Sequence, residues 1–293
     1  MGGRQPTYGL LGEDGPVKPV QARLTTIALL LLALAVTACS SGRSQSDAQP
    51  SDGASVSSAP PAPAAPRVGS CHDLTVEEAT DPVDPGKDVP CRRPHTAVTI
   101  KVGKLPALAD GHLLAVDSPT VRARLAKTCP PALGGYVGGD QTVQRLSRFE
   151  VVWFGPSLDQ ADAGADWFRC DVVGLRREGA LIALPRTMKG VLDAPGALDR
   201  FGTCGTAAPS AKKFQRVVCS EKHSWQAVDV VDLPGDARYL AKNVTAMGDA
   251  ACKEVASQRS DGALKFTWSF EWPTRAQWSG GQRYGYCWVP EAG

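Results

Sequence analysis

The sequence predicts an α+β fold built from two tandem repeats, each a small antiparallel sheet with one main helix, and each stapled by two disulfides. Three observations support this prediction. The chain of 293 residues holds nine cysteines. Eight of these cysteines form two sets of four with similar spacing. The strand-like and helix-like segments between the cysteines also recur in the same order in both sets, as internal repeats do.

The N-terminal residues 1–39 predict a lipoprotein signal peptide. The apolar run from Ile27 to Val36 is shorter than the roughly 20 apolar residues of a membrane-spanning helix, and it has the length of a signal-peptide apolar region. It ends in Val36-Thr37-Ala38-Cys39, which resembles a bacterial lipobox. That resemblance implies cleavage before Cys39 and acylation of its thiol with chains such as palmitate. An ordinary secretory signal that ends in cysteine is the alternative.

Residues 40–67 predict a disordered tether. Ser, Ala, Pro and Gly predominate there, and such a segment buries too little apolar surface to offset the entropy of ordering. We therefore expect the lipid on Cys39 to hold the protein on the cell membrane, with its folded part on the extracytoplasmic face. A glycosylated or partner-binding tail is the alternative for this segment.

Charge and cysteine usage narrow the classes of function. The net charge is +2, and the charges of both signs are mixed along the chain without a long basic run. Nucleic acid is therefore not an expected partner. With Cys39 assigned to lipid, eight cysteines remain, and an even number in an exported chain favours disulfides over metal or redox chemistry. We expect neither a cofactor nor a metal site.

The cysteines mark a first repeat at residues 68–188, a linker rich in Gly, Pro and Ala at 189–198, and a second repeat at 199–293. The first set is Cys71, Cys91, Cys129 and Cys170, and the second set is Cys204, Cys219, Cys252 and Cys287. Their intervals are 20, 38 and 41 residues, then 15, 33 and 35. The second cysteine of each set opens Cys-x-x-x-His, and a strand-like run ending in Leu-Pro follows each histidine.

The third cysteine of each set lies in or at the end of a helix-like stretch. In the first repeat Ser118 and Pro119 start this helix as a cap and a first-turn proline, and Pro130-Pro131 stops it. In the second repeat the helix is expected over residues 236–258. A strand follows in which every second side chain points to the same face of the sheet. Its matched positions are Phe149, Val151, Trp153 and Gly155 in the first repeat and Phe266, Trp268, Phe270 and Trp272 in the second.

Four landmarks of the first repeat and two of the second carry a resemblance to a known family. They are Gly69-Ser-Cys71, Cys91-Arg-Arg-Pro-His95, Cys129 and Trp167-Phe-Arg-Cys170, then Gly202-Thr-Cys204 and Tyr284-Gly-Tyr-Cys287. This pattern resembles the actinobacterial septum-formation domain, a Cys-rich extracytoplasmic module of lipoproteins and membrane-anchored proteins. The second copy has Lys222 where the proline of the first stands. The resemblance implies a role near the division septum, and its motifs concern fold rather than chemistry.

The repeat also predicts how the eight cysteines pair, because equivalent cysteines of two copies should pair equivalently. The predicted disulfides are Cys71–Cys91, Cys129–Cys170, Cys204–Cys219 and Cys252–Cys287. The first type would hold a loop against the start of a strand, and the second would fix the helix to the last strand. Zinc bound at Cys-x-x-x-His is the competing interpretation.

Two histidines are candidates for ligand contact. His95 and His223 are equivalent by repeat, and each could contact a ligand or sense pH. The preferred alternative is that each fixes the turn after its cysteine through a hydrogen bond. His72 and His112 have no counterparts in the second copy, and no motif places a nucleophile near them.

An acidic loop and a tryptophan complete the candidates. Asp159, Asp162 and Asp166 could hold calcium, but their spacing differs from a calcium loop and a solvated loop is preferred. Trp278 lies in a Gly-rich segment, where an exposed ring would suit a sugar of the cell-wall glycan. The alternative for Trp278 is a ring folded back onto the core. For the aromatic residues of the second alternating strand, a core face is preferred.

The sequence favours a non-enzymatic, lipid-anchored binding protein linked to septum formation or to the cell-envelope machinery. Its expected partners are the membrane, an envelope or division protein, and cell-wall glycan. One alternative is a glycan-binding module that uses an exposed Trp278. The other is a surface enzyme acting on cell-wall polymer, which would need paired acids. Acids are present at Glu77, Glu78, Asp232 and Asp236, but no spacing brings two into one cleft, and we predict no catalytic residue.

Overall fold

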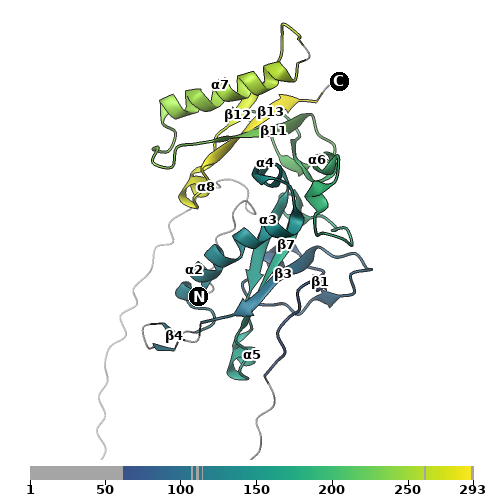
Figure 1. Ribbon diagram of the computed structural model, residues 1–293, viewed down its shortest axis with the longest axis vertical. Helices are drawn as coiled ribbons and strands as arrows, with labels where there is room; N and C mark the ends of the chain where they lie inside the picture. The colour runs from purple at the N-terminus through teal and green to yellow at the C-terminus, as the bar shows by residue number, and fades with distance from the viewer. Residues whose placement is uncertain (1–61, 107, 110–111, 114, 261, 292–293) are drawn as a thin grey trace, which may run out of the picture. The chain divides into compact units, whose positions relative to one another are not determined.

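The computed structural model describes residues 62–291 except 107, 110–111, 114 and 261 (Figure 1). The predicted signal peptide with Cys39, and the tether up to residue 61, lie outside the described residues. Residues 62–67, the described end of the predicted tether, form neither helix nor strand. Among the helices that are described, none combines the length and apolar character that crossing a bilayer requires.

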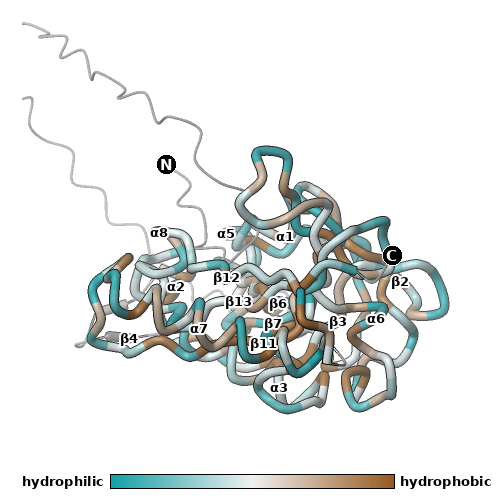
Figure 2. The backbone as a smooth tube through the Cα atoms, turned by 90° about the horizontal axis from the view of Figure 1, so that it is seen from above, coloured by the Kyte–Doolittle hydropathy of each residue, from teal (hydrophilic) through white to brown (hydrophobic). Residues whose placement is uncertain are grey.

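The first sheet is antiparallel, and its order is β2-β1-β3-β7-β6, with β8 paired to β7. Its strands are β1 (Cys71–His72), β2 (Asp88–Val89), β3 (Ala97–Lys104), β6 (Phe149–Phe154), β7 (Trp167–Arg177) and β8 (Ala180–Leu181). A separate short hairpin pairs β4 (Leu108–Ala109) with β5 (His112–Leu113). In Figure 2 the hydrophobic colour is concentrated along the strands, and the hydrophilic colour lies mainly in the loops around them.

The second sheet is also antiparallel, and its order, β10-β9-β11-β13-β12, matches the first sheet strand for strand. Its strands are β9 (Thr203–Gly205), β10 (Arg216–Val218), β11 (Trp225–Asp232), β12 (Ser269–Glu271) and β13 (Tyr284–Pro290). Both central pairs contain a bulge at the same place. The register shifts between Thr99 and Lys101 beside Cys170, and between Ala227 and Asp229 beside Cys287. The alternating strand of the second half is shorter than expected, because Phe266 and Trp268 precede β12.

The helices differ from the prediction of one main helix per half. They are α1 (Val76–Thr80), α2 (Pro119–Thr128), α3 (Pro130–Val137), α4 (Gln141–Leu146), α5 (Leu158–Asp162), α6 (Ala197–Phe201), α7 (Lys242–Gln258) and α8 (Arg275–Ser279), with a 3₁₀ turn at Val191–Asp193. Ser118 caps α2 as predicted, by accepting a hydrogen bond from the Val121 amide. Pro130 ends α2 but also starts α3, because a proline fits the first turn of a helix.

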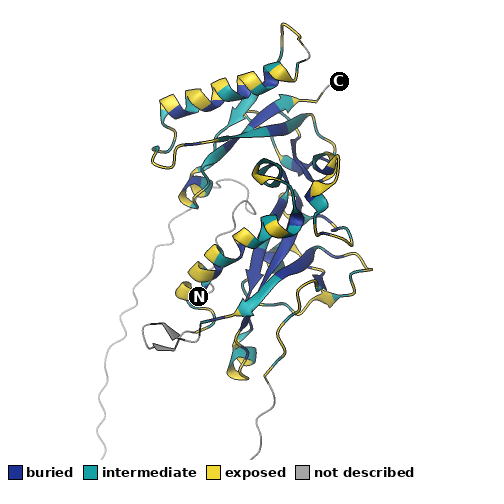
Figure 3. Cartoon of the chain, in the orientation of Figure 1, coloured by how far each residue is buried: buried dark blue, intermediate teal, exposed yellow. Residues whose placement is uncertain are grey.

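The long helix of the second half, α7, starts later than predicted. It begins at Lys242 rather than Asp236, and it ends at Gln258 as expected. Leu240, with a φ of 56°, is in the left-handed region just before it, so the preceding residues cannot continue a right-handed helix. The turns of α7 alternate between a buried side and an exposed side (Figure 3). Its buried residues are Val244, Gly248, Cys252 and Ala256.

Four disulfides join the same cysteine pairs that the repeat predicts: Cys71–Cys91, Cys129–Cys170, Cys204–Cys219 and Cys252–Cys287. Two of them attach a helix to an interior strand of its sheet, Cys129 at the end of α2 to β7 and Cys252 of α7 to β13. Zinc at the Cys-x-x-x-His segments is excluded, because Cys91 and Cys219 are both oxidised.

The two halves share buried residues. The core of the first half, built around Trp153, Phe149 and Leu125, also includes Phe201 of α6 and Val218 of β10. The residues of the predicted linker are packed rather than free, since Leu192 and Ala197 are buried in this core. Conversely, Leu146 of α4 packs against Ala227 and Trp288 of the second sheet. The sheets are therefore fixed against each other by buried contacts from both sides.

Removal of the disulfide between α7 and β13 should weaken the fold. The double substitution Cys252→Ala and Cys287→Ala is expected to lower the free energy of unfolding by about 3–4 kcal/mol, the chain-entropy value for a loop of this size. Urea unfolding followed by tryptophan fluorescence measures this difference. Under a reductant that opens all disulfides, the variant and the native chain should become equally stable. An unchanged unfolding midpoint under oxidising conditions would contradict the assigned role of this bridge.

Candidate functional site

A cleft of about 550 Å³ lies where β6 and α4 of the first half meet β10, α8 and β13 of the second. Its polar lining includes Gln144, Arg148, Glu150, Arg216, Gln282 and Tyr284. Cavities of this size hold small ligands or short chain segments in other proteins. The cleft therefore is the first candidate for a binding site.

The start of β6 places two charged residues at the cleft: Arg148 directly precedes the strand, and Glu150 is its second residue. Its start is fixed because the Arg148 amide donates to the Phe201 carbonyl at 2.7 Å and the Leu175 amide donates to the Arg148 carbonyl at 2.9 Å. The Arg148 side chain is held as well, since its Nε donates to the Leu175 carbonyl at 3.2 Å. Arg148 and Glu150 both line the cleft, and the charge of Arg148 acts on the carboxyl group of Glu150.

The second half supplies Arg216, whose guanidinium is held by an acid. Its Nη2 donates to Oε1 of Glu271 at 2.5 Å, and its Nε donates to Oε2 at 3.4 Å. Trp288 Nε1 donates to the same Oε2 at 3.0 Å, so the carboxylate of Glu271 is itself fixed. The guanidinium carbon of Arg216 also lies 5.9 Å from the centre of the Tyr286 ring.

Two tyrosines and Arg145 join the walls of the cleft. The hydroxyl of Tyr286 donates to the Arg145 carbonyl at 3.2 Å. Arg145 lies 4.4 Å over the ring of Tyr284 and pairs with Asp232 at 2.6 Å. These contacts run from α4 of the first half to β11 and β13 of the second. The side chains of the cleft are therefore positioned by both halves together.

Burial sets the ionisation of the cleft. It raises the pKa of Glu150 from 4.5 to about 7, and the positive charges of Arg148 and Arg216 oppose this effect. Burial also lowers the pKa of Arg148 and raises the pKa of Tyr284 and Tyr286, so both phenols stay neutral donors near pH 7. The charge of Glu150 consequently changes close to neutral pH.

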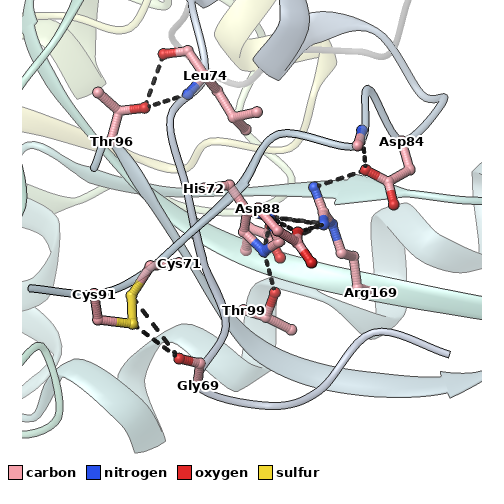
Figure 4. Close-up of polar contacts among 12 residues, drawn as sticks. Gly69, Cys71, His72, Leu74, Asp84, Asp88, Cys91, Thr96, Thr99 and Arg169 are labelled. Atoms are coloured by element: carbon pink, nitrogen blue, oxygen red, sulfur yellow. Dashed lines mark hydrogen bonds and ion pairs between the residues drawn. A yellow bond between two sulfur atoms is a disulfide. The ribbon is translucent and has the colours of Figure 1, made fainter. Parts of the chain in front are cut away.

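A second polar cluster is buried in the first half, around Arg169 (Figure 4). The Arg169 side chain is fully buried, lies 4.5 Å over the Phe154 ring, and pairs with Asp84 and Asp171, each at 3.2 Å. Asp88, which is largely exposed, reaches the cluster from β2 and lies 2.7 Å from Nδ1 of His72.

His72 connects the strands of this cluster. Its Nε2 lies 2.8 Å from the Thr99 hydroxyl, and its Nδ1 lies 3.0 Å from Nη1 of Arg169. Burial and the charge of Arg169 lower the pKa of His72 to about 4, so its ring is neutral at neutral pH. Burial raises the pKa of Asp171, against the opposing effects of Arg169 and of a hydrogen bond with Thr99.

The corresponding place in the second sheet is apolar. The registers of β3 with β7 and of β11 with β13 put Tyr286 where Arg169 stands, and Trp288 where Asp171 stands. Gly205 occupies the position of His72 in the register, and its missing side chain leaves room for Phe214 and Trp288, whose rings meet edge to face at 5.3 Å. The strand order alone therefore does not require a polar cluster at this place.

The structure assigns a turn-fixing contact to both candidate histidines. Nδ1 of His95 lies 2.9 Å from the Arg93 carbonyl, and Nδ1 of His223 lies 2.7 Å from the Glu221 carbonyl, two residues back in each case. His95 is buried, and Nε2 of His223 pairs with Glu291. These geometries favour the structural alternative for both residues.

Trp278 is not exposed, which corrects the hypothesis of an exposed ring that binds glycan. It belongs to α8, is 9% exposed, and stacks on Trp272 with ring centres 5.3 Å apart. The guanidinium of Arg283 covers it at 4.0 Å. The Gly-rich segment predicts a loop, whereas Thr274 caps a helix there.

The acidic candidates are distributed over several elements. Asp159 and Asp162 belong to α5, and Asp166 pairs with Lys104 at 2.8 Å. Glu77 and Glu78 lie on α1, where Glu78 completes a capping box with Thr75. Asp232 ends β11 and pairs with Arg145. Asp236 is exposed in the turn that follows β11. In the part of the chain that the structure describes, no group of three metal-binding side chains is present.

Sequence reasoning missed the charged residues of the cleft. Arg148 and Glu150 alternate with the apolar residues of a predicted strand, a pattern that usually marks a solvated face. Arg216 precedes Cys219 by three residues and belongs to no motif. The signal that could have pointed to the cleft is the charge of both signs on a strand close to the boundary between the repeats.

Comparison with known proteins gives one match. Residues 140–287 match the family model described as Septum formation. The match begins at Asp140, the cap of α4, and ends at Cys287 in β13. It contains all the charged side chains of the cleft, whereas His72, Asp84, Asp88 and Thr99 of the buried cluster precede it. No curated protein and no solved structure matches the chain.

Loss of Arg169 should destabilise the first half strongly. Arg169→Met leaves the buried Asp171 without its cation, and breaking a buried ion pair in this way typically costs about 3–5 kcal/mol. The loss should be larger at pH 8 than at pH 5, because an unpaired buried acid is tolerated only when protonated. Urea unfolding at both pH values measures it. Asp88→Asn is the control, since an exposed partner should change stability by less than about 1 kcal/mol. Equal stability of Arg169→Met and the native chain at pH 8 would refute the role of this pair.

The raised pKa of Glu150 predicts a pH-dependent gain in stability for Glu150→Gln. Between pH 4.5 and about 7 the folded chain binds more protons at this group than the unfolded chain, so its contribution to stability falls as pH rises. Glutamine removes that loss, so the variant should be more stable than the native chain at pH 8, by the order of 1–3 kcal/mol, and equally stable near pH 4. Thermal unfolding at the two pH values tests this. A variant that is less stable at pH 8 would show that the Glu150 carboxylate is well solvated or well paired.

Proposed function

Because the chain belongs to the septum-formation family, we propose that it is a lipid-anchored extracytoplasmic protein that binds a component of the division or cell-envelope machinery and catalyses no reaction. The observation that carries the proposal is the cleft, because every side chain that shapes its charge lies within the segment that matches the family. A binding function requires such positioned groups, and it requires no reactive set.

Two features support the proposed compartment. Four disulfides stabilise the described part of the chain, and such bonds persist in oxidising surroundings outside the cytoplasm. The lipobox-like segment ending at Cys39 supports acylation and attachment to the membrane. The support for the disulfides comes from the structure, and the support for the anchor comes from the sequence.

We also propose that the chain arose as two tandem copies of one module. The same strand order, the same position of the bulge and the same pairing of cysteines support this origin. In each half, a cysteine at or in a helix forms a disulfide with the fourth strand of the sheet order, beside the bulge. Divergence would then have given the second half an aromatic face where the first has the Arg169 cluster.

The ionisable groups of the cleft favour binding over hydrolysis. A polymer-cleaving site of the usual kind needs two carboxyl groups facing the scissile bond. Among the described residues that line the cleft, Glu150 is the carboxylic acid, and Glu271 behind it is held by Arg216. One observation favours catalysis, namely the pKa of Glu150 near 7. Loss of polymer during incubation with cell walls would therefore revive the enzyme hypothesis.

Substitution of the predicted anchor tests the proposal in cells. The Cys39→Ser chain should leave the membrane fraction, whereas the neighbouring substitution Ser41→Ala should not. Deletion of the chain should reduce the frequency of septa, and the native chain, but not Cys39→Ser, should restore it. Cell fractionation and microscopy of stained septa provide the readouts. Retention of Cys39→Ser on membranes would exclude the anchor, and normal septation after deletion would exclude the septum role.

A further inference from the structure

We propose that the cleft between the two sheets binds an acidic peptide segment, and that the guanidinium of Arg148 pairs with a carboxylate of that segment. This inference rests on the proposed binding function and names its ligand class. Three arguments carry it: the charge of the lining, the state of Arg148, and the amide groups around it.

The charge of the lining is positive in balance. Arg145, Arg148 and Arg216 line the cleft, against one carboxylate, that of Glu150. Arg145 is paired with Asp232, and Arg216 is paired with Glu271. The acid nearest in sequence to the third arginine, Arg148, is Glu150. Because the pKa of Glu150 is raised, this acid is readily protonated. A ligand that supplies a carboxylate would complete this arrangement.

The side chain of Arg148 is held so that the two Nη groups of its guanidinium remain available to a ligand. Its Nε is used by the Leu175 carbonyl at 3.2 Å, which fixes the plane of the guanidinium. Within the described residues, its two Nη groups make no hydrogen bond or ion pair. Two parallel N–H groups match the two oxygens of a carboxylate, and such paired contacts are among the strongest polar contacts in proteins.

The neutral groups of the lining match a peptide backbone. Gln144 and Gln282 each use the amide nitrogen on a protein carbonyl, at 2.7 Å to Gly139 and 3.0 Å to Tyr284. Gln277 uses its oxygen to accept from the Thr274 amide at 2.8 Å. The amide oxygens of Gln144 and Gln282 thus remain as acceptors, and the amide nitrogen of Gln277 remains as a donor. These groups suit the N–H and C=O groups of an extended chain.

Glu150 should make this binding depend on pH. The titratable and charged groups around it in the cleft are Arg148, which directly precedes β6, Arg145 of α4, Arg216 of β10, and Tyr284 and Tyr286 of β13, with Glu271 of β12 held behind Arg216. When Glu150 ionises, its charge competes with the ligand carboxylate for Arg148. Binding of an acidic peptide should therefore weaken as pH rises from 6 to 8.

The experiment compares two blocked peptides on the full chain purified in mild detergent. The probes are acetyl-Gly-Glu-Gly-Glu-Gly-amide and its counterpart with glutamine in place of each glutamate, titrated by calorimetry at pH 6 and pH 8. The expected result is binding of the glutamate peptide, weaker at pH 8, and little binding of the glutamine peptide. Equal affinity for the two peptides, or no binding of either, would overturn the proposal.

Three variants locate the binding. Arg148→Gln should weaken binding of the glutamate peptide about tenfold or more, the value of a lost charged hydrogen bond. Arg186→Gln, an exposed arginine outside the cleft lining, is the matched control and should bind like the native chain. Glu150→Gln should bind more tightly than the native chain at pH 8, a gain that misfolding cannot produce. Unchanged binding by Arg148→Gln, or weaker binding by Glu150→Gln at pH 8, would refute the assigned roles.

The outcome separates this inference from the function it rests on. Normal septation after deletion, together with selective peptide binding, would leave the ligand class standing and remove the septum role. A septation defect with no selectivity between the peptides would do the reverse.

Discussion

In each half of the molecule one disulfide joins a helix to an interior strand of the sheet, Cys129 to Cys170 of β7 and Cys252 to Cys287 of β13. A five- or six-stranded sheet with a few packed helices buries a limited core. The bridge restricts the unfolded chain and brings the helix to one place on the sheet. The bulge beside each bridged cysteine then fixes where the strand turns its side chains, so the positions of Arg169 and Tyr286 follow from this one constraint.

The cleft depends in turn on how the halves share their cores. Phe201 and Val218 enter the core of the first half, and Leu146 enters that of the second. These exchanges fix α4 and β6 against β10 and β13. Arg148 and Glu150 from one half can then face Arg216 and Tyr284 from the other. A site built in this way needs both halves, which gives a physical reason why the matching segment, residues 140–287, spans the end of one half and most of the other.

The features that could be predicted from the sequence are those that recur in both halves or depend on local chemistry. The cleft, which occurs once, could not be predicted. The eight cysteines, Ser118 as a cap and the equivalence of Phe149 with Phe266 all rest on repetition or on local chemistry, and the structure pairs the cysteines as expected. The expectation of one helix per half was wrong for the first half, because Pro130 allows a new helix to start where another ends. The cleft lies between the halves, and side chains that meet there, such as Arg148 and Arg216, are far apart in the sequence. No local pattern could therefore indicate them.

The contrast between the two sheet faces explains why one half carries a buried polar cluster. In the second half, Leu146 of α4 covers Ala227 and Trp288, so an aromatic filling is stable there. In the first half, Ala79 of α1 packs on this face beside Phe154, and β2 and the loop before it bring the carboxylates of Asp88 and Asp84 to the edge of the sheet. A buried arginine next to these acids satisfies them, and His72 and Thr99 complete the hydrogen bonds. The polar cluster thus neutralises these acids inside the first half. The cleft between the halves is a separate charged site, in which Arg148 keeps its Nη groups for a ligand.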